Sequence, residues 1–369
     1  MRSDMKRFSL GLLLALLALL PFSAFAQRAD IAALRAYAEK AMPRCPGSVI
    51  TLDPLPTSGP AGFIPYNLTQ TSTDKTCGRK TYMLYSPASQ QVLIGTVFPL
   101  GMDARPATDR IAEVVMEALK QPVHVTVAPF PLPDGLHAVS MNRDTAYGQF
   151  AYHGFIDQSQ AWMIVGFRGS LHTDPTQSLL EALNLSGAVR RGDPKSKVKI
   201  IELSDFECPT CGRAHKKVEP IIAKNLKKVD YYRLDLPLFE MHPWAMDAAL
   251  GARAISRVAP AKYWEYVNWV YANQETIGNS KQPYEKTLHD FCEDHDINWA
   301  AVEKIVKSPA ERNALLDQVS RAFDVGVNST PTYIINGTIL GFGPEGSFTI
   351  EQIRKALGLP PEPAKPAKK

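Results

Sequence analysis

Apolar and polar positions alternate in short runs along the first half of the chain, a pattern typical of half-buried strands. Two of these runs resemble each other: ITLDPLP at residues 50–56 and VTVAPFP at residues 125–131 share their apolar positions and both prolines. A strand–turn–strand pattern follows each run, at residues 81–98 and 146–167, and each copy closes with a helical pattern containing Glu-Ala-Leu. A further helix, over residues 30–42, precedes the first copy. We therefore predict an α+β region that is an internal duplication of several strands and then a helix.

The second half of the chain changes from strand to helical periodicity and back. A βαβ pattern comes first, a long helical stretch of some eighty residues follows, and a ββα pattern ends the region. An Asn336-Gly337 pair at the predicted β-turn is a strong hairpin signal. The predicted elements are a strand at 197–203, a helix at 211–226, a strand at 229–239, helices from 242 to about 323, a hairpin at 330–343 and a helix at 349–358.

Composition and breaks in the pattern divide the chain into two domains. The 369 residues are 45% hydrophobic and 21% charged, which is the composition of a globular protein, and the length suggests two domains. A polar, basic segment with Gly and Pro, residues 186–197, predicts a flexible linker. Residues 360–369 lack packable side chains and predict a solvated tail. We expect an α+β domain at 27–187 and an α/β domain at 188–359.

The first 26 residues have the pattern of a secretory signal peptide. A basic start precedes the apolar run SLGLLLALLALL, and small residues at Ala24 and Ala26 fit a cleavage site before Gln27. We therefore expect a periplasmic or secreted protein, in a compartment where disulfides persist, with no stable membrane span. The leader holds three basic residues against one acidic residue, so the formal net charge of +4 overstates the charge of the mature chain. That charge gives no basis for a nucleic-acid partner.

Cys208 and Cys211 lie two residues apart, directly after the strand at 197–203. Haem attachment through such a pair requires a His after the second Cys, and Gly212 stands there. A closed zinc site uses four ligands, and the chain has no second pair of this spacing; His215 is more simply a surface residue. A structural bridge over two residues restrains the unfolded chain very little. These considerations favour a redox pair.

A redox function gives each cysteine a different task. Cys208 is expected at a helix N-terminus, where unpaired N–H groups and the helix dipole favour a thiolate, so it is the predicted attacking sulfur. Cys211, one turn further along, is the predicted resolving sulfur. Pro209 fits the first helical turn, where a missing N–H costs nothing. Thr330-Pro331 opens a later strand, and a cis bond there would leave the preceding backbone free to pair with an extended peptide.

Residues 192–358 resemble the DsbA-like branch of the thioredoxin superfamily, the periplasmic and secreted thiol–disulfide oxidoreductases. The resemblance rests on GDPKSKVKIIELSDFECPTC, LDLPLFEMHPWAMDAALGARA, KYWEYVNWVY and VNSTPTYIINGT. It implies a thioredoxin-like fold with a helical insertion capping the site, a redox pair at Cys208 and Cys211, and a cis-proline at Pro331 with Thr330 lining the substrate groove. It further implies that Glu202 is a buried acid assisting proton transfer; the alternative is an edge-strand surface residue. The lysine that partners this acid in some members is not at its expected place, although Arg233 is nearby.

The other cysteines have simpler interpretations. In an oxidising compartment, Cys45 and Cys77 most simply form a structural disulfide, with a second redox relay as the alternative. Cys292 lies on an amphipathic helix and is expected to be a buried free thiol. His289, Cys292 and His295 share helical spacing that could hold a metal, but we expect no metal site and no cofactor.

The expected function is exchange of disulfides with cysteines of unfolded or misfolded exported proteins, coupled to a redox partner protein. One alternative is a disulfide isomerase or reductase, because dimeric isomerases of this superfamily also carry an additional N-terminal domain. A second alternative is a chaperone-like protein in which the first domain binds clients and the cysteines are secondary. For that first domain the two candidate tasks are homodimerisation and client binding.

Overall fold

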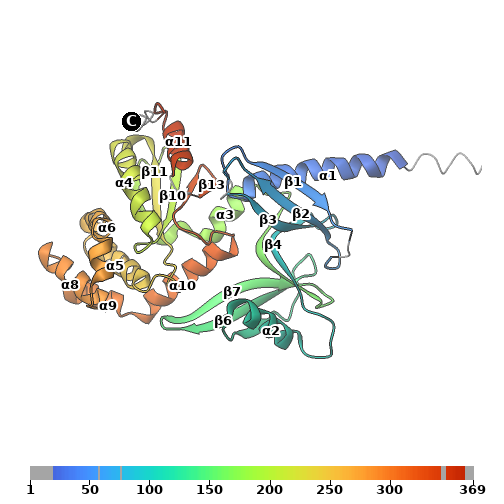
Figure 1. The fold of residues 1–369 in the computed structure, drawn as a ribbon, viewed down its shortest axis with the longest axis horizontal. Coiled ribbons are helices and arrows are strands. Elements are labelled where there is room, and N and C mark those ends of the chain that lie inside the picture. The colour runs from blue at the N-terminus through green and yellow to red at the C-terminus, as the bar shows by residue number, and fades with distance from the viewer. Residues whose placement is uncertain (1–19, 57–58, 75–76, 342–345, 362–369) are drawn as a thin grey trace, which may run out of the picture.

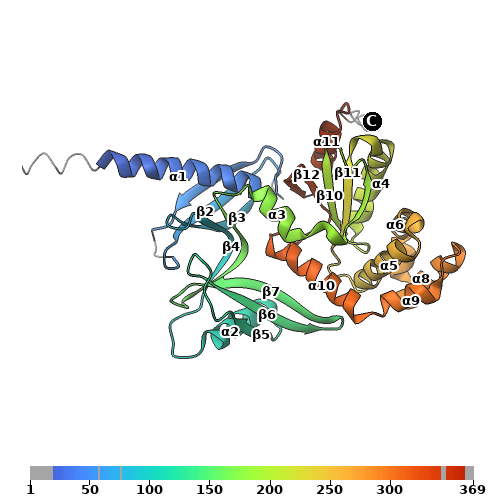
Figure 2. The same cartoon turned by 180° about the vertical axis from the view of Figure 1, so that it is seen from behind.

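The computed structural model describes residues 20–56, 59–74, 77–341 and 346–361, and it contains two domains that lie side by side (Figures 1 and 2). Residues 1–19 of the expected leader and 362–369 of the expected tail lie outside the described residues. No helix in the described part of the chain combines the length and the apolar character that a membrane crossing requires.

The first domain is one eight-stranded antiparallel sheet with three helices. The strand order is β1-β2-β3-β4-β8-β7-β6-β5, which is two four-stranded meanders joined where β4 pairs with β8. The elements are α1 Leu20–Ala41, β1 Val49–Pro54, β2 Ile64–Thr71, β3 Arg79–Ser86, β4 Gln91–Pro99, α2 Ala107–Leu119, β5 His124–Val127, β6 His137–Thr145, β7 Gly148–Ile156, β8 Trp162–Ser170 and α3 Pro175–Leu183.

Two glycines face each other at the junction of the meanders. Gly95 of β4 pairs with Gly166 of β8, and each occupies the same position in its own meander. A Cβ on Gly95 would lie 2.1 Å from the carbonyl oxygen of Val165, and one on Gly166 would lie 2.3 Å from that of Ile94. The two strands therefore approach too closely for any side chain at this pair.

The order of elements occurs twice, as expected, but the helices pack on the strands in a different grouping. The helix that packs on β1 is α1, and the helix that packs on β5 is α2, so each meander carries the helix that precedes it. The sequence suggested strands followed by a helix. In chain order that holds, because α2 follows β4 and α3 follows β8; in the packing, α1 lies on the first meander and α2 on the second.

The second domain has a five-stranded sheet in the order β13-β12-β10-β11-β9, with β10 and β11 parallel. Helices α4 and α11 cover one face, while the insertion α5–α10 and the first domain lie against the other. The elements are η1 Leu185–Gly187, β9 Val189–Gly192, β10 Lys199–Ser204, α4 Pro209–Lys224, η2 Leu226–Lys228, β11 Asp230–Asp235, α5 Ala245–Val258, η3 Pro260–Lys262, α6 Tyr263–Ala272, α7 Gln274–Asn279, α8 Tyr284–Asp294, α9 Trp299–Val306, α10 Pro309–Asp324, β12 Thr332–Ile335, β13 Thr338–Gly341 and α11 Ser347–Ala356. This confirms the predicted thioredoxin-like fold with a helical insertion, preceded by a separate domain.

The segment expected to be a flexible linker is instead part of the second sheet. Residues 189–192 form β9, which pairs antiparallel with β11. Arg190 Nε lies 2.7 Å from Asp230 Oδ1. Arg191 forms an ion pair with Glu219, and its guanidinium lies over the Trp264 ring. The basic residues that suggested solvent exposure therefore have acidic and aromatic partners in the fold.

The two domains share a packed interface. Helix α10 lies on β7, and the β6–β7 hairpin extends from the first domain beneath it (Figures 1 and 2). Phe150 of β7 packs edge to face against Phe239 and Phe323, and the Ser320 hydroxyl donates to the Ala151 carbonyl at 2.7 Å. The buried apolar cluster is continuous across this boundary. The first domain is therefore docked on the second rather than tethered to it.

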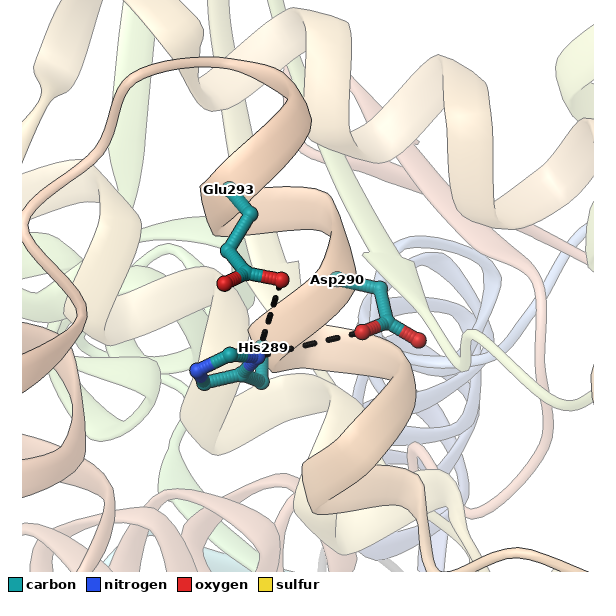
Figure 3. A group of neighbouring side chains, drawn as sticks. All are labelled: His289, Asp290 and Glu293. Carbon is teal, nitrogen blue, oxygen red and sulfur yellow. Dashed lines mark ion pairs between the residues drawn. The ribbon is translucent and has the colours of Figure 1, made fainter.

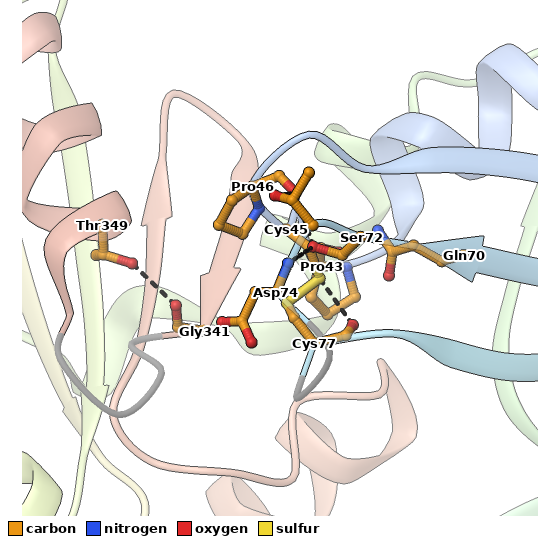
Figure 4. Close-up of a disulfide and its surroundings, with 10 residues drawn as sticks. Pro43, Cys45, Pro46, Gln70, Ser72, Asp74, Cys77, Gly341 and Thr349 are labelled. Atoms are coloured by element: carbon orange, nitrogen blue, oxygen red, sulfur yellow. Dashed lines mark hydrogen bonds between the residues drawn. A yellow bond between two sulfur atoms is a disulfide. The ribbon is translucent and has the colours of Figure 1, made fainter.

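A disulfide lies near a second contact between the domains. The structure joins Cys45 to Cys77, beside Ser72 and Asp74 (Figure 4). The neighbouring Arg44 donates its backbone N–H to the Ile339 carbonyl at 2.7 Å, which brings the first domain against β13. The bridge thus closes the loop at the point where the first domain meets the edge of the second sheet.

Candidate active site

Cys208 lies where β10 has ended and α4 begins. It is the N-cap residue of α4, with Pro209 in the first turn, and its side chain is 7% exposed. Cys211 is one turn further along the helix and is fully buried. Both are free thiols in this structure. The Cys208 sulfur is 3.6 Å from the carbonyl oxygen of Thr330, across from the helix.

The surroundings of the pair favour a thiolate on Cys208 and a protonated Cys211. A hydrogen bond from the Cys211 thiol, helped by the backbone N–H groups of Cys211 and Thr210, lowers the pKa of Cys208 to about 5 against the effect of burial. Burial, and then the hydrogen bond to Cys208, raises the pKa of Cys211 well above its usual value. The outer sulfur is thus the one that ionises more readily, and the inner sulfur holds its proton.

The Thr330–Pro331 peptide bond is cis, as the sequence predicted. It lies immediately before β12, the strand that pairs with β10. The fold therefore brings Thr330 and Pro331 to the Cys208 sulfur from a segment more than a hundred residues away in the chain.

Glu202 is a buried residue on the central strand β10, which excludes the interpretation as an edge-strand surface residue. Arg233, its neighbour in register on β11, donates from Nη1 to Glu202 Oε1 at 2.9 Å. The hydroxyl of Tyr231 donates to the other carboxylate oxygen. Arg233 also lies 3.2 Å from Asp235. An arginine therefore pairs with the acid at the place where the resemblance led us to look for a lysine.

A buried polar network connects this pair to the cysteines. Arg233 donates to the Tyr271 hydroxyl at 3.1 Å, and that hydroxyl lies 2.8 Å from Ser204 Oγ. The backbone N–H of Asp205 donates to the Cys211 sulfur at 3.4 Å. A hydrogen bond from Ser204 acts on Cys211 as well. These contacts form a continuous buried polar network from Glu202 through Arg233 and Tyr271 to Ser204, beside Cys211.

Sequence reasoning missed Asp205 and His242, which flank the site. Asp205 is buried, and one carboxylate oxygen accepts the N–H groups of Glu207 at 2.8 Å and Cys208 at 3.3 Å. The other oxygen lies 2.7 Å from His242 Nδ1. The only signal in the sequence was an Asp three residues before Cys208, the spacing at which a side chain caps a turn. His242 comes from a distant loop and had no local signal.

The insertion closes over the start of α4. Gln274 donates from Nε2 to the carbonyl oxygens of Phe206 at 2.7 Å and Cys208 at 3.0 Å. A Cβ at Gly212 would lie 2.1 Å from Gln274 Oε1, so a larger residue there would require the Gln274 amide to move. The insertion thus contacts the backbone of Cys208 directly through Gln274.

The histidines and the fifth cysteine lie elsewhere. His215 is buried, not on the surface as expected, because its ring packs at a tilt against Tyr271 and its Nε2 lies 2.7 Å from Asn268 Oδ1. Cys292 is a buried free thiol whose pKa burial raises to about 11. His289 lies instead beside Asp290 and Glu293 on the exposed side of α8 (Figure 3). His295 stacks on Phe291, so the three residues with helical spacing do not converge.

Comparisons with known proteins find similarity in the second domain of this chain. A family model described as thioredoxin matches residues 185–358. The chain is 27% identical over 167 residues to Na(+)/H(+) antiporter NhaA 3 of Salinispora tropica and 26% identical over 152 residues to NhaA 1 of Mycobacterium sp. strain KMS. The matched part is 45% and 40% of this chain but only 24% and 23% of those proteins, so the chain spans about a quarter of the length of these curated relatives.

Three of the solved structures that are similar to this chain each cover a little under half of it. Oxidised BdbD from Bacillus subtilis is 16% identical with a TM-score of 0.41, covering 47% of this chain and 95% of its own. Alpha-DsbA1 from Wolbachia pipientis is 19% identical with a TM-score of 0.42, covering 49% and 96%. Protein-disulfide isomerase from Novosphingobium aromaticivorans is 16% identical with a TM-score of 0.40, covering 46% and 97%. The region that the thioredoxin family model matches is thus the second domain, which carries the cysteine pair beside a cis-proline.

Proposed function

We propose that this protein is a thiol–disulfide oxidoreductase that exchanges disulfides with cysteines of exported proteins. The observation that carries the proposal is the asymmetry of the pair. The Cys208 thiol has a pKa of about 5, and its sulfur lies 3.6 Å from the Thr330 carbonyl oxygen. Cys211 is buried, and its raised pKa keeps it protonated. A low thiol pKa makes Cys208 a good leaving group in the last step of disulfide donation.

Disulfide donation would proceed in two exchanges. A client thiolate attacks the Cys208 sulfur of the Cys208–Cys211 disulfide, that bond breaks, and Cys211 leaves and takes up a proton. A second client thiolate then attacks the client sulfur bound to Cys208, and Cys208 leaves as a thiolate. The client loses two electrons and the pair gains them, so a redox partner protein is required to reoxidise the pair. Run in reverse, the same steps describe a reductase, and repeated attack on client disulfides describes an isomerase.

The cis segment at Thr330 supports a proposal that an extended chain binds there. The cis bond lies just before β12, and its carbonyl oxygen faces the reactive sulfur. A client backbone that pairs with this segment would bring its own cysteine to Cys208. Export to the periplasm or beyond is part of the proposal, supported by the leader pattern and by the Cys45–Cys77 bridge.

Trapping the mixed disulfide tests the proposal. Reduced Cys211→Ala protein, incubated with a peptide that contains a disulfide, should retain one peptide on Cys208, because the resolving sulfur is missing. Cys208→Ala should retain none, and Cys292→Ala, which alters only a buried thiol, should turn over like the unaltered protein. Absence of any adduct with Cys211→Ala would rule out the proposed chemistry. If Cys208→Ala/Cys211→Ala still binds unfolded clients with full affinity, the chaperone-like alternative is favoured.

Homodimerisation of the first domain is also a proposal. The outer strands of its sheet, β1 and β5, end the strand order and so offer edges to a second copy. Light scattering on the full chain is the appropriate test, because removal of the first domain would expose the packed face of α10. A dimer mass supports the proposal, and a monomer at high micromolar concentration contradicts it.

A further inference from the structure

One loop of the second domain lies between the redox pair and the first domain. This loop, residues 236–244, follows β11 and is called here the His242 loop. On its inner side, the Leu238 backbone N–H donates to Asp205 Oδ2 at 2.8 Å, and that of Trp244 donates to Glu207 Oε2 at 2.7 Å. Both carboxylates belong to the turn that leads into Cys208. The inner side of the loop is therefore anchored to the active-site turn by two acids.

The outer side of the same loop is held by the β6–β7 hairpin of the first domain. The Tyr147 hydroxyl donates to the Pro243 carbonyl at 3.1 Å, and its ring packs edge to face on Phe239. Arg143 forms an ion pair with Glu240, which also accepts from the Tyr152 hydroxyl at 3.3 Å. These contacts come from one hairpin and converge on one loop.

His242 lies at the centre of this arrangement. Its Nδ1 is 2.7 Å from Asp205 Oδ2, while the other oxygen of the same buried carboxylate accepts the backbone N–H of Cys208 at 3.3 Å. One carboxylate therefore ties the imidazole to the backbone of the reactive cysteine. A movement of the His242 loop would change both interactions together.

We propose that the first domain is a positioning element of the redox centre, and that its β6–β7 hairpin keeps His242 on the carboxylate that anchors Cys208. The inference rests on the proposed redox function and gives the first domain a part in it. His242 is a positioning residue, because it acts on the thiolate through Asp205 and through its charge. The described acids and thiol that face it are Asp205, Glu207 and Cys208, and the Arg143–Glu240 pair lies on the hairpin side.

The charge of His242 gives the arrangement a chemical consequence. The hydrogen bond to Asp205 raises the pKa of His242, against the effect of partial burial, so the imidazolium persists to higher pH. A cation beside a thiolate favours the ionised form of the sulfur. A well-placed His242 thus adds to the helix N-terminus in holding Cys208 ionised.

The test measures the thiolate of Cys208 as a function of pH in the reduced full-length protein, by absorbance at 240 nm with Cys208→Ser as the blank. His242→Gln keeps a donor for Asp205 and removes the charge; we expect the Cys208 pKa to rise by about one unit. Tyr147→Phe/Arg143→Gln removes the contacts of the hairpin with Pro243 and Glu240, together with the Arg143–Gln121 hydrogen bond inside the first domain. All of these lie far from the sulfur in the chain. We expect the Cys208 pKa to rise by roughly half a unit, because only part of the free energy of each lost hydrogen bond reaches the thiolate. Gln149→Ala, exposed on the same hairpin, and His172→Gln, an exposed histidine, are the matched controls and should leave the pKa unchanged.

The outcomes separate this inference from the proposed function. Rises in the two test variants and none in the controls support it, provided that circular dichroism shows all proteins folded. If the unaltered protein exchanges with glutathione and has a low Cys208 pKa, but neither test variant shifts it, the positioning role is overturned and the redox function stands. If the hairpin variant leaves the pKa unchanged and His242→Gln raises it, the proposed part of the first domain is overturned. An unaltered protein with an ordinary Cys208 pKa overturns the inference, and failure to exchange overturns the proposed function itself.

Discussion

Arg233 donates to Glu202 across two parallel strands at 2.9 Å, and both side chains are buried. Removal of one partner of a buried ion pair leaves the other charge without compensation, which typically costs about 3–5 kcal/mol. We predict a loss of that size for Arg233→Met in the free energy of unfolding, measured with urea. Glu202→Gln should cost less, because its amide oxygen still accepts from Arg233.

The same pair of variants checks the network. If the free energy of unfolding of Arg233→Met lies within about 1 kcal/mol of that of the unaltered protein, Arg233 does not compensate the buried charge of Glu202.

Reduced and oxidised protein should respond differently to pH. The folded reduced protein holds the Cys208 pKa at about 5, well below that of a free thiol near 8.5, so the thiolate stabilises the folded state. That stabilisation is full above the unfolded pKa and is lost as the pH falls towards 5. In the oxidised protein Cys208 does not titrate. The difference in Tm, reduced minus oxidised, should therefore grow between about pH 5 and pH 8.5, and a constant difference over that range would contradict the low pKa.

The Cys45–Cys77 bridge should be structural. It joins residues 32 apart, and the chain-entropy model assigns a loop of that length about 3–4 kcal/mol. Cys45→Ser/Cys77→Ser is expected to lose that much stability while keeping the Cys208 pKa. When the denatured, unaltered protein is treated with a thiol-alkylating reagent, intact-mass analysis should show that neither Cys45 nor Cys77 is alkylated. Free thiols at both positions would contradict the bridge.

The glycine pair at the centre of the first sheet gives a test of the fold itself. An added methyl group at Gly95 or Gly166 meets backbone atoms that cannot give way, and Gly166 also has a φ of +152°. Either change to Ala should cost at least about 2 kcal/mol in urea unfolding. Gly341→Ala, at an exposed glycine whose Cβ would contact nothing within 4 Å, is the control. Equal stabilities for Gly166→Ala and the control would show that the two meanders do not approach as closely as described.

Local sequence patterns predicted the structural features that depend on residues close together in the chain. Apolar periodicity found β10, the Asn336–Gly337 hairpin and the repeated strands of the first domain, and the cysteine spacing found the pair at the start of α4. Contacts between distant segments left no such signal. Asp205 and His242 meet only through the fold, and the basic Arg190 and Arg191 suggested a linker because their partners lie on other elements.

The most direct test of the central claim is the redox equilibrium of Cys208 and Cys211 with glutathione, followed by mass spectrometry of the thiol-blocked full-length protein. A single two-electron transition is predicted, in which both cysteines change together while Cys292 stays reduced. A strongly oxidising midpoint would favour disulfide donation, and a strongly reducing one would favour reductase work. Independent behaviour of the two sulfurs, with Cys208 carrying only glutathione and Cys211 free throughout, would contradict the claim that they form one redox couple.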